Sequence, residues 1–184
     1  MGIGGKLTFI IVFLIVAGMG ISGIMSYQNG EESLIASKKQ QFEELRESRK
    51  HNILTYFENI ENNLLLLTQT PLVSSAINEL GSEYRESGLT SEDYKKIEQQ
   101  YDDFFTDNLS NYQLYDIFLI DKSGNIVYTV EKEADLGTNL VHGKYQDSSL
   151  ANVYRNIQKG IQLSDFKYYA PSQEPASFMA GPVY

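Results

Sequence analysis

The first feature of the chain is an apolar run near its start. Residues 7–26 form twenty positions without a charge, whereas the chain beyond residue 30 is polar and acidic. A helix needs about 20 apolar residues to cross the roughly 30 Å of hydrocarbon in a bilayer. The run therefore predicts a transmembrane helix over residues 7–27, preceded by a short cytoplasmic segment, residues 1–6.

A cleaved signal peptide is the alternative for this run. Lys6 supplies a positive start, but the run is longer than the usual 7–15 apolar residues of a signal-peptide core, and no small-x-small cleavage site follows it cleanly. We therefore expect an uncleaved anchor in the lipid bilayer. Gly18, Ser22 and Ser26 lie four residues apart, a spacing that lets two membrane helices approach closely. A homodimer is expected on this ground, although small residues are common in membrane helices generally.

Charge gives a weaker indication of orientation. Lys6 favours a cytoplasmic N-terminus, whereas Lys38, Lys39 and Arg46 beyond the run act in the opposite sense. Long domains are translocated largely regardless of charge. We expect the N-terminus inside and the remainder periplasmic or extracellular, at the inner or plasma membrane.

After a short break at residues 28–30, a one-sided apolar stripe runs through residues 31–69. Its members are Leu34, Phe42, Leu45, Ile53, Tyr56, Ile60, Leu64 and Leu67, mostly three or four residues apart. This spacing is typical of an amphipathic helix. The helix joins the anchor almost directly, so we expect a stalk that carries a signal; a plain scaffold helix of a monomeric domain is the alternative.

Two shorter helices, 72–80 and 91–109, complete a helical part over residues 31–110. Gly81 is expected to end the first of them, and residues 81–88 are expected to form a loop.

At Tyr115 the period changes from helical to strand-like. The runs 115–120 and 126–130 flank a five-residue loop with a glycine, which is a strong β-hairpin signal. A helix over 149–159 and strands over 161–169 and 176–180 follow. The order predicts an α+β fold whose second part, residues 111–184, is a mixed or antiparallel sheet with flanking helices. Such a sheet usually needs a further strand to close its core and cover its edge. We therefore expect this chain to be the N-terminal part of a longer protein.

Composition narrows the function classes. All 24 acidic residues and 14 of the 15 basic residues follow residue 30, a net charge of −10 for that part. This balance argues against a nucleic-acid partner, whose phosphates require a basic patch. The chain has no cysteine, which excludes disulfides and thiolate metal sites, and it has 13 tyrosines but no tryptophan.

The sequence contains no recognisable active site. His51 and His142 lack a second ligand at metal-like spacing, and the pair Asp102-Asp103 is expected on a solvated helical surface. The glycines of residues 2–5 precede a membrane helix and not a nucleotide-binding turn. We expect a protein that is not an enzyme and that has no catalytic residues, cofactor or metal.

Six stretches, residues 115–133, 135–140, 147–150, 164–166, 169–172 and 181–183, carry a resemblance. Together with the order membrane helix, long helix and mixed sheet, they resemble the PAS-like, Cache-type sensor region of methyl-accepting chemotaxis receptors. The resemblance implies extracytoplasmic sensing of a small molecule. It also implies signalling through a second span and a HAMP segment to methylated helices, absent here, that act with an adaptor on a chemotaxis histidine kinase. Similar regions front sensor histidine kinases and diguanylate cyclases, and a binding protein tethered by one helix is a further alternative.

Ligand contacts are expected from polar and aromatic side chains that the strands turn toward the long helix. The candidates are Tyr112, Tyr115, Tyr128, Asp165 and Tyr168. The Asp165 carboxylate would pair with a ligand amine, and the tyrosine rings would enclose it. Tyr128 is expected on the same strand face as Ile126 and Val130. The alternative is that the tyrosines only pack and that Asp165 only bonds to a turn.

Overall fold

The computed structural model describes residues 3–184. Its contacts divide the chain into two compact units, the first ending at Thr55 and the second comprising Tyr56–Tyr184. The predicted division at residue 110 is therefore not where the units separate. The helices and the strands that follow them belong to the same unit.

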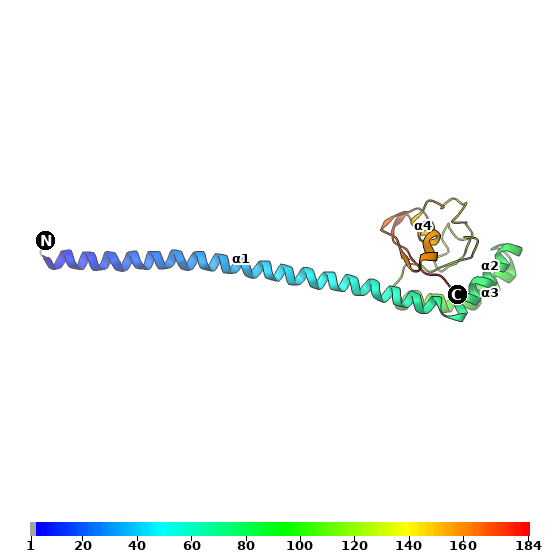
Figure 1. Ribbon diagram of the computed structural model, residues 1–184, viewed down its shortest axis with the longest axis horizontal. Helices are drawn as coiled ribbons and strands as arrows, with labels where there is room; N and C mark the ends of the chain where they lie inside the picture. The colour runs from blue at the N-terminus through cyan, green and yellow to red at the C-terminus, as the bar shows by residue number, and fades with distance from the viewer. Residues whose placement is uncertain (1–2) are drawn as a thin grey trace. The chain divides into compact units, whose positions relative to one another are not determined.

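Helix α1 comprises Ile3–Thr68 (Figure 1). Its residues up to Thr55 form the first unit, and its last turns belong to the second unit. Its apolar run passes the length and composition test for a membrane span, with a mean hydropathy of 2.5 and none of the span buried. The predicted break at residues 28–30 is wrong, because α1 continues through it. Gly30 meets no neighbouring side chain, and one glycine costs a helix only about 1 kcal/mol.

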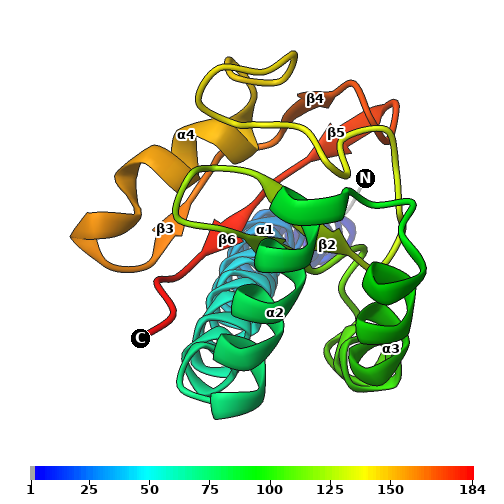
Figure 2. The same cartoon turned by 90° about the vertical axis from the view of Figure 1, so that its right-hand side faces the viewer.

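In the second unit, α2 (Pro71–Ser87) and α3 (Glu92–Tyr112) lie side by side (Figure 2). The end predicted for α2 at Gly81 is wrong, as is the loop predicted over residues 81–88. A Cβ at Gly81 would lie 3.5 Å from Cβ of Asp121, so the glycine serves close packing inside the helix. The helix ends before Gly88, whose φ of 77° is a conformation that suits glycine.

The hairpin expected at residues 115–130 is confirmed. Strands β1 (Phe118–Ile120) and β2 (Ile126–Thr129) pair in antiparallel fashion, with Leu119 opposite Tyr128 and Ile120 opposite Ile126. The register shift between these pairs leaves Val127 as an extra residue, which is a β-bulge. Tyr128 and Ile126 consequently belong to different hydrophobic clusters, so their predicted common face is wrong.

Residues 137–140 cover the other edge of β2. The Ile126 N–H donates to the Thr138 carbonyl at 2.9 Å, and the Gly137 N–H donates to the Ile126 carbonyl at 2.9 Å. The Leu140 N–H likewise donates to the Gly124 carbonyl at 2.8 Å. This pairing satisfies backbone groups that an open strand edge would expose.

The remainder of the unit contains one α-helix, one 3₁₀ turn and four short strands. These are α4 (Ser149–Asn156), the 3₁₀ turn η1 (Ile157–Lys159), β3 (Gln162–Leu163), β4 (Lys167–Tyr169), β5 (Glu174–Ala176) and β6 (Met179–Ala180). β3 pairs with β6, and β4 pairs with β5, both antiparallel. The single strand predicted over 161–169 is wrong, because Ser164 interrupts it: its hydroxyl accepts the Phe178 N–H at 2.9 Å.

Two hydrophobic clusters form the core. The first lies between α2, α3 and the hairpin and contains Leu80, Tyr94, Phe105 and Tyr128. The second joins Ile126, Leu140, Leu150 and Tyr169. The predicted α+β fold, with a long N-terminal helix and small antiparallel sheets, is confirmed at this level.

Candidate functional site

Tyrosine hydroxyls hold much of the second unit together. Seven donate to other groups of the fold: Tyr84, Tyr94, Tyr101, Tyr115, Tyr128, Tyr154 and Tyr169. The acceptors are backbone carbonyls or carboxylates. Except for the exposed Tyr115, these tyrosines are buried or partly buried while their polar ends are satisfied. The high tyrosine content therefore has a structural use here before any ligand is considered.

The candidate Tyr128 is a core residue. It is 0% exposed, its ring centroid lies 5.1 Å from that of Phe105, and its hydroxyl donates to Oδ1 of Asp102 at 2.8 Å. Both partners belong to α3, so Tyr128 faces α3 and not the long helix. Burial, and then the hydrogen bond to Asp102, raise the pKa of the Tyr128 phenol, which stays neutral.

An ion-pair group covers Tyr128 at the surface of α3. The Lys132 ammonium lies 3.2 Å from Oε1 of Glu98 and 3.3 Å from Oδ1 of Asp102. Asp102 and Asp103 lie on the surface of α3, as expected, but the Asp102 carboxylate also accepts a buried phenol and pairs with Lys132. Lys132 has a positive φ of 52°. The group can bind charged ligands only by exchanging these internal partners.

Asp116 fastens the end of β2, a role that the sequence did not reveal. Its Oδ2 accepts the Thr129 hydroxyl, and its Oδ1 accepts the N–H groups of Ile117, Val130 and Glu131. Burial raises the pKa of Asp116 to about 6, although these hydrogen bonds oppose the rise. The only sequence signal was an acidic residue directly before an apolar strand.

Tyr112, at the end of α3, and Tyr115, between α3 and β1, share no common hydrogen-bond partner among the described residues. Tyr112 is the last residue of α3 and is partly buried. Tyr115 is exposed, and its hydroxyl donates to Oε1 of Glu133 at 2.6 Å. This hydrogen bond raises the pKa of the Tyr115 phenol to about 12.

Asp165 and Tyr168 lie on the surface around β4. The Tyr168 side chain is 69% exposed, and it lies opposite Pro175 in the β4–β5 hairpin. Asp165 is exposed, and its Oδ1 accepts the neighbouring Phe166 N–H at 2.9 Å. The structure thus distributes the five candidates over a core position, a helix end and two surface regions. Their role in ligand binding stays a prediction.

Asp135 is the other acidic residue that the sequence reasoning missed. It is 0% exposed, and its Oδ2 accepts the hydroxyl of Tyr169 from β4. Its Oδ1 has no hydrogen-bond partner among the described residues. The Asp-Leu-Gly stretch at residues 135–137 was the available signal, but the sequence did not indicate burial.

The described residues contain no group of three or more His, Cys, Asp or Glu side chains arranged to hold a metal. His51 and His142 are both exposed.

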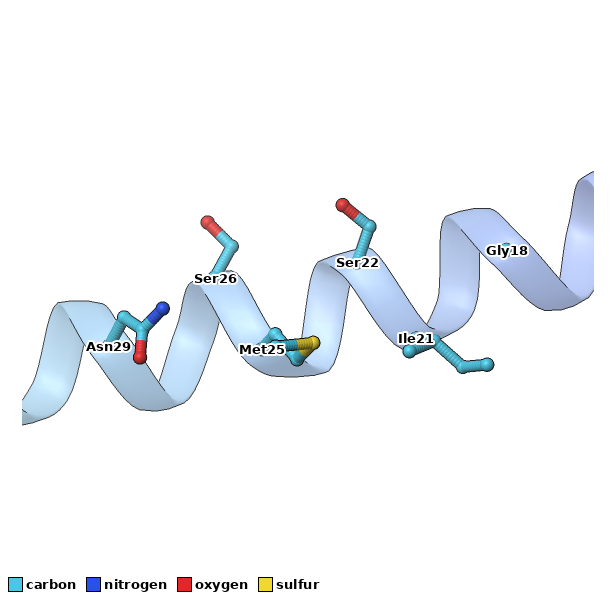
Figure 3. Close-up of a pocket in the computed structure, with 6 residues that line it drawn as sticks. All are labelled: Gly18, Ile21, Ser22, Met25, Ser26 and Asn29. Carbon is cyan, nitrogen blue, oxygen red and sulfur yellow. The ribbon is translucent and has the colours of Figure 1, made fainter.

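A shallow groove lies on the part of α1 that contains the candidate membrane span. Gly18, Ser22 and Ser26 line it, with Ile21, Met25 and Asn29 beside them. Ser22 and Ser26 project from the same side of the helix (Figure 3). The groove is formed by one helix alone, so it is not an enclosed ligand cavity.

No protein-family model matches the chain, and no curated protein or solved structure is detectably similar to it. The geometry of the chain itself is therefore the basis for any functional proposal.

Proposed function

We propose that this chain is the extracytoplasmic small-molecule sensing region of a transmembrane chemotaxis receptor. In this proposal residues 7–27 anchor a homodimer in the inner or plasma membrane, with the N-terminus in the cytoplasm. The second unit is the PAS-like, Cache-type sensor. Its signal passes through a second span and a HAMP segment to methylated helices, which act with an adaptor on a histidine kinase.

One observation carries the proposal: the helix that contains the candidate span also forms part of the sensor's packing. Leu67, near the end of α1, packs against the first hydrophobic cluster. A Cβ at Gly181 would lie 3.5 Å from Cδ2 of Leu64 and 3.2 Å from Cγ2 of Thr68. A change in the packing around these residues therefore acts directly on a helix that continues to Ile3 without a break.

Asp165 and Tyr168 are the candidates best placed to meet a ligand from solution. Both are exposed, and the Tyr168 hydroxyl makes no hydrogen bond within the described residues. Tyr128 and Tyr115 already donate to Asp102 and Glu133, so in this proposal they shape the fold around the ligand.

The continuity of α1 equally supports a sensor region of a membrane histidine kinase or a diguanylate cyclase. A single-helix-tethered binding protein is the remaining alternative. The gene sequence downstream of the Tyr184 codon distinguishes them: a second apolar span followed by heptad-rich helices supports the chemotaxis receptor, and a catalytic domain supports a kinase or cyclase.

Ligand binding is tested on the full chain in detergent micelles by thermal unfolding with a panel of amino acids, carboxylates and amines. A compound that binds only the folded state raises the unfolding midpoint. At 100 times its Kd it adds about 2.7 kcal/mol to the free energy of unfolding. We expect at least one compound to do so, and Asp165→Asn or Tyr168→Phe to reduce the shift. Lys159→Gln, an exposed change away from both residues, is the matched control. An unchanged midpoint with the whole panel at millimolar concentration would contradict the proposal.

A further inference from the structure

The segment that leaves β2, residues 130–140, crosses the second unit as an irregular strap (yellow-green to yellow in Figure 2). Side chains hold it to four other parts of the fold. These contacts are Asp116 to the Val130 and Glu131 N–H groups, Lys132 to Glu98 and Asp102, Tyr169 to Asp135, and the Tyr84 hydroxyl to the Gly137 carbonyl.

The contact at Asp135 differs from the others because the carboxyl group is fully buried. Its Oδ2 accepts the Tyr169 hydroxyl, whereas its Oδ1 has no partner among the described residues. The described ion pairs include none to Asp135. The backbone N–H groups of Asp135 and Leu136 also favour the carboxylate. A buried carboxylate with only neutral donors and no cation is nevertheless costly, whereas a neutral carboxyl group is much less so.

The ionisable groups around this contact do not offset a negative charge. Glu133 lies on the strap itself, and its negative charge opposes ionisation of Asp135. The centroid of the Tyr145 ring lies 6.3 Å from that of the Tyr169 ring, and a phenol supplies no positive charge. The Lys144 ammonium lies over the Tyr145 ring, 5.0 Å from its centroid. Burial raises the pKa of Asp135, while the hydrogen bond from Tyr169 acts in the opposite direction.

We propose that Asp135 and Tyr169 form a proton-operated clasp, in which proton uptake by Asp135 tightens the strap against β4 and proton loss loosens it. The inference rests on the buried contact and does not depend on the function proposed above. The direction follows from linkage: a carboxyl group whose folded pKa is raised stabilises the closed form at low pH, and this stabilisation is lost as pH rises through the folded pKa.

Hydrogen exchange of the full chain in micelles tests the clasp. The reporters are the Gly137 and Leu140 amides, which bond to β2 and to the loop before it. After correction for intrinsic exchange rates, the opening equilibrium of the strap is expected to fall from pH 7.5 to pH 5. For one linked proton the limit is about tenfold per pH unit. Asp135→Asn is expected to abolish this dependence.

Asp116 must be separated from Asp135, because it also binds the strap and its own pKa is raised. The comparison is therefore made in an Asp116→Asn background. An identical pH dependence with and without Asp135→Asn in this background would overturn the proposal.

Two further measurements cover the case in which Asp135→Asn fails to fold. Tyr169→Phe removes the hydrogen bond that lowers the pKa of Asp135, so the transition of the strap is expected to move to higher pH. In the unmutated chain, the carboxyl carbon of Asp135 is expected to titrate in NMR above the range of ordinary aspartates. Titration near pH 4 in the unmutated chain, or an unmoved transition in Tyr169→Phe, would contradict the clasp.

Discussion

The two units use apolar and aromatic residues in opposite ways. Phe42 in the first unit is 70% exposed, whereas Phe105 in the second is 1% exposed and contacts Phe104 and Tyr128. The second unit supplies its own partners for its apolar side chains. Within the described residues the first unit does not, and its large apolar side chains are exposed.

The tyrosines show the same contrast. Tyr27 in the first unit is 73% exposed, and all seven tyrosines that donate a hydroxyl hydrogen bond belong to the second unit. Side-chain chemistry thus specifies the tertiary structure of the second unit, whereas residues 3–55 require only helix formation and an apolar surface.

The largest expected effect is at Phe105. Phe105→Ala leaves a cavity between α3 and the hairpin and is expected to lower the free energy of unfolding by about 3–5 kcal/mol. Phe42→Ala is the matched control and is expected to change it by less than about 0.5 kcal/mol. Urea unfolding of the full chain in micelles, followed by tyrosine fluorescence, measures both. Equal effects would remove the distinction between the units.

A charge in the candidate span tests what covers the first unit. Ile15→Arg places a charge inside the span, at an insertion cost of about 2.5–3.5 kcal/mol at a helix centre. Ile53→Arg makes the same change outside the span, at a position similarly exposed. The fraction of chain in carbonate-washed membranes is expected to fall only for Ile15→Arg. Full retention of that variant would argue against a membrane span.

The hydroxyl of Tyr128 tests whether this residue serves the fold or a ligand. Tyr128→Phe removes a buried hydrogen bond to Asp102 and is expected to destabilise the chain by about 1.5–3 kcal/mol, the range for bonds to charged groups. Tyr168→Phe, at an exposed tyrosine, is expected to leave the unfolding midpoint unchanged. If Tyr128→Phe leaves the free energy of unfolding unchanged, a ligand-binding role for the Tyr128 hydroxyl is favoured over a structural one.

The smallest expected effect is a pH response of the second unit at Asp116. Its folded pKa is raised from 3.8 to about 6, so its stabilisation is complete below pH 3.8 and is lost as pH rises through 6. Between pH 7.5 and pH 5 this group is expected to add about 1.4 kcal/mol to the free energy of unfolding. Denaturant titrations at both pH values should show this increment shrinking in Asp116→Asn, and an unaltered increment would exclude Asp116 as its source.

Local sequence patterns predicted the elements that depend on local chemistry. The apolar run near the start and the loop with Gly124, whose φ is 86°, gave the candidate span and the hairpin. The patterns failed where distant residues decide the outcome. Gly81 continues a helix because Asp121 packs against it, and Ser164 divides a strand because it bonds to Phe178.

The candidate site was harder to predict for the same reason. A β-bulge at Val127 decides which way Tyr128 points, and no periodicity reveals a bulge. The burial of Asp135 depends on Tyr169, 34 positions later in the chain. Acidic side chains are usually exposed, so a reading of the sequence alone favours the surface for Asp102, Asp116 and Asp135.

The central claim, an extracytoplasmic sensor anchored by its N-terminal helix, is tested most directly by cysteine labelling. The chain has no cysteine, so single cysteines at exposed Lys122 and at Gly5, which has no neighbouring side chain, report on the two sides of the span. In intact spheroplasts, a membrane-impermeant maleimide should label Lys122→Cys at once and Gly5→Cys only after permeabilisation. Labelling of Gly5→Cys alone, or of both before permeabilisation, would contradict the claim.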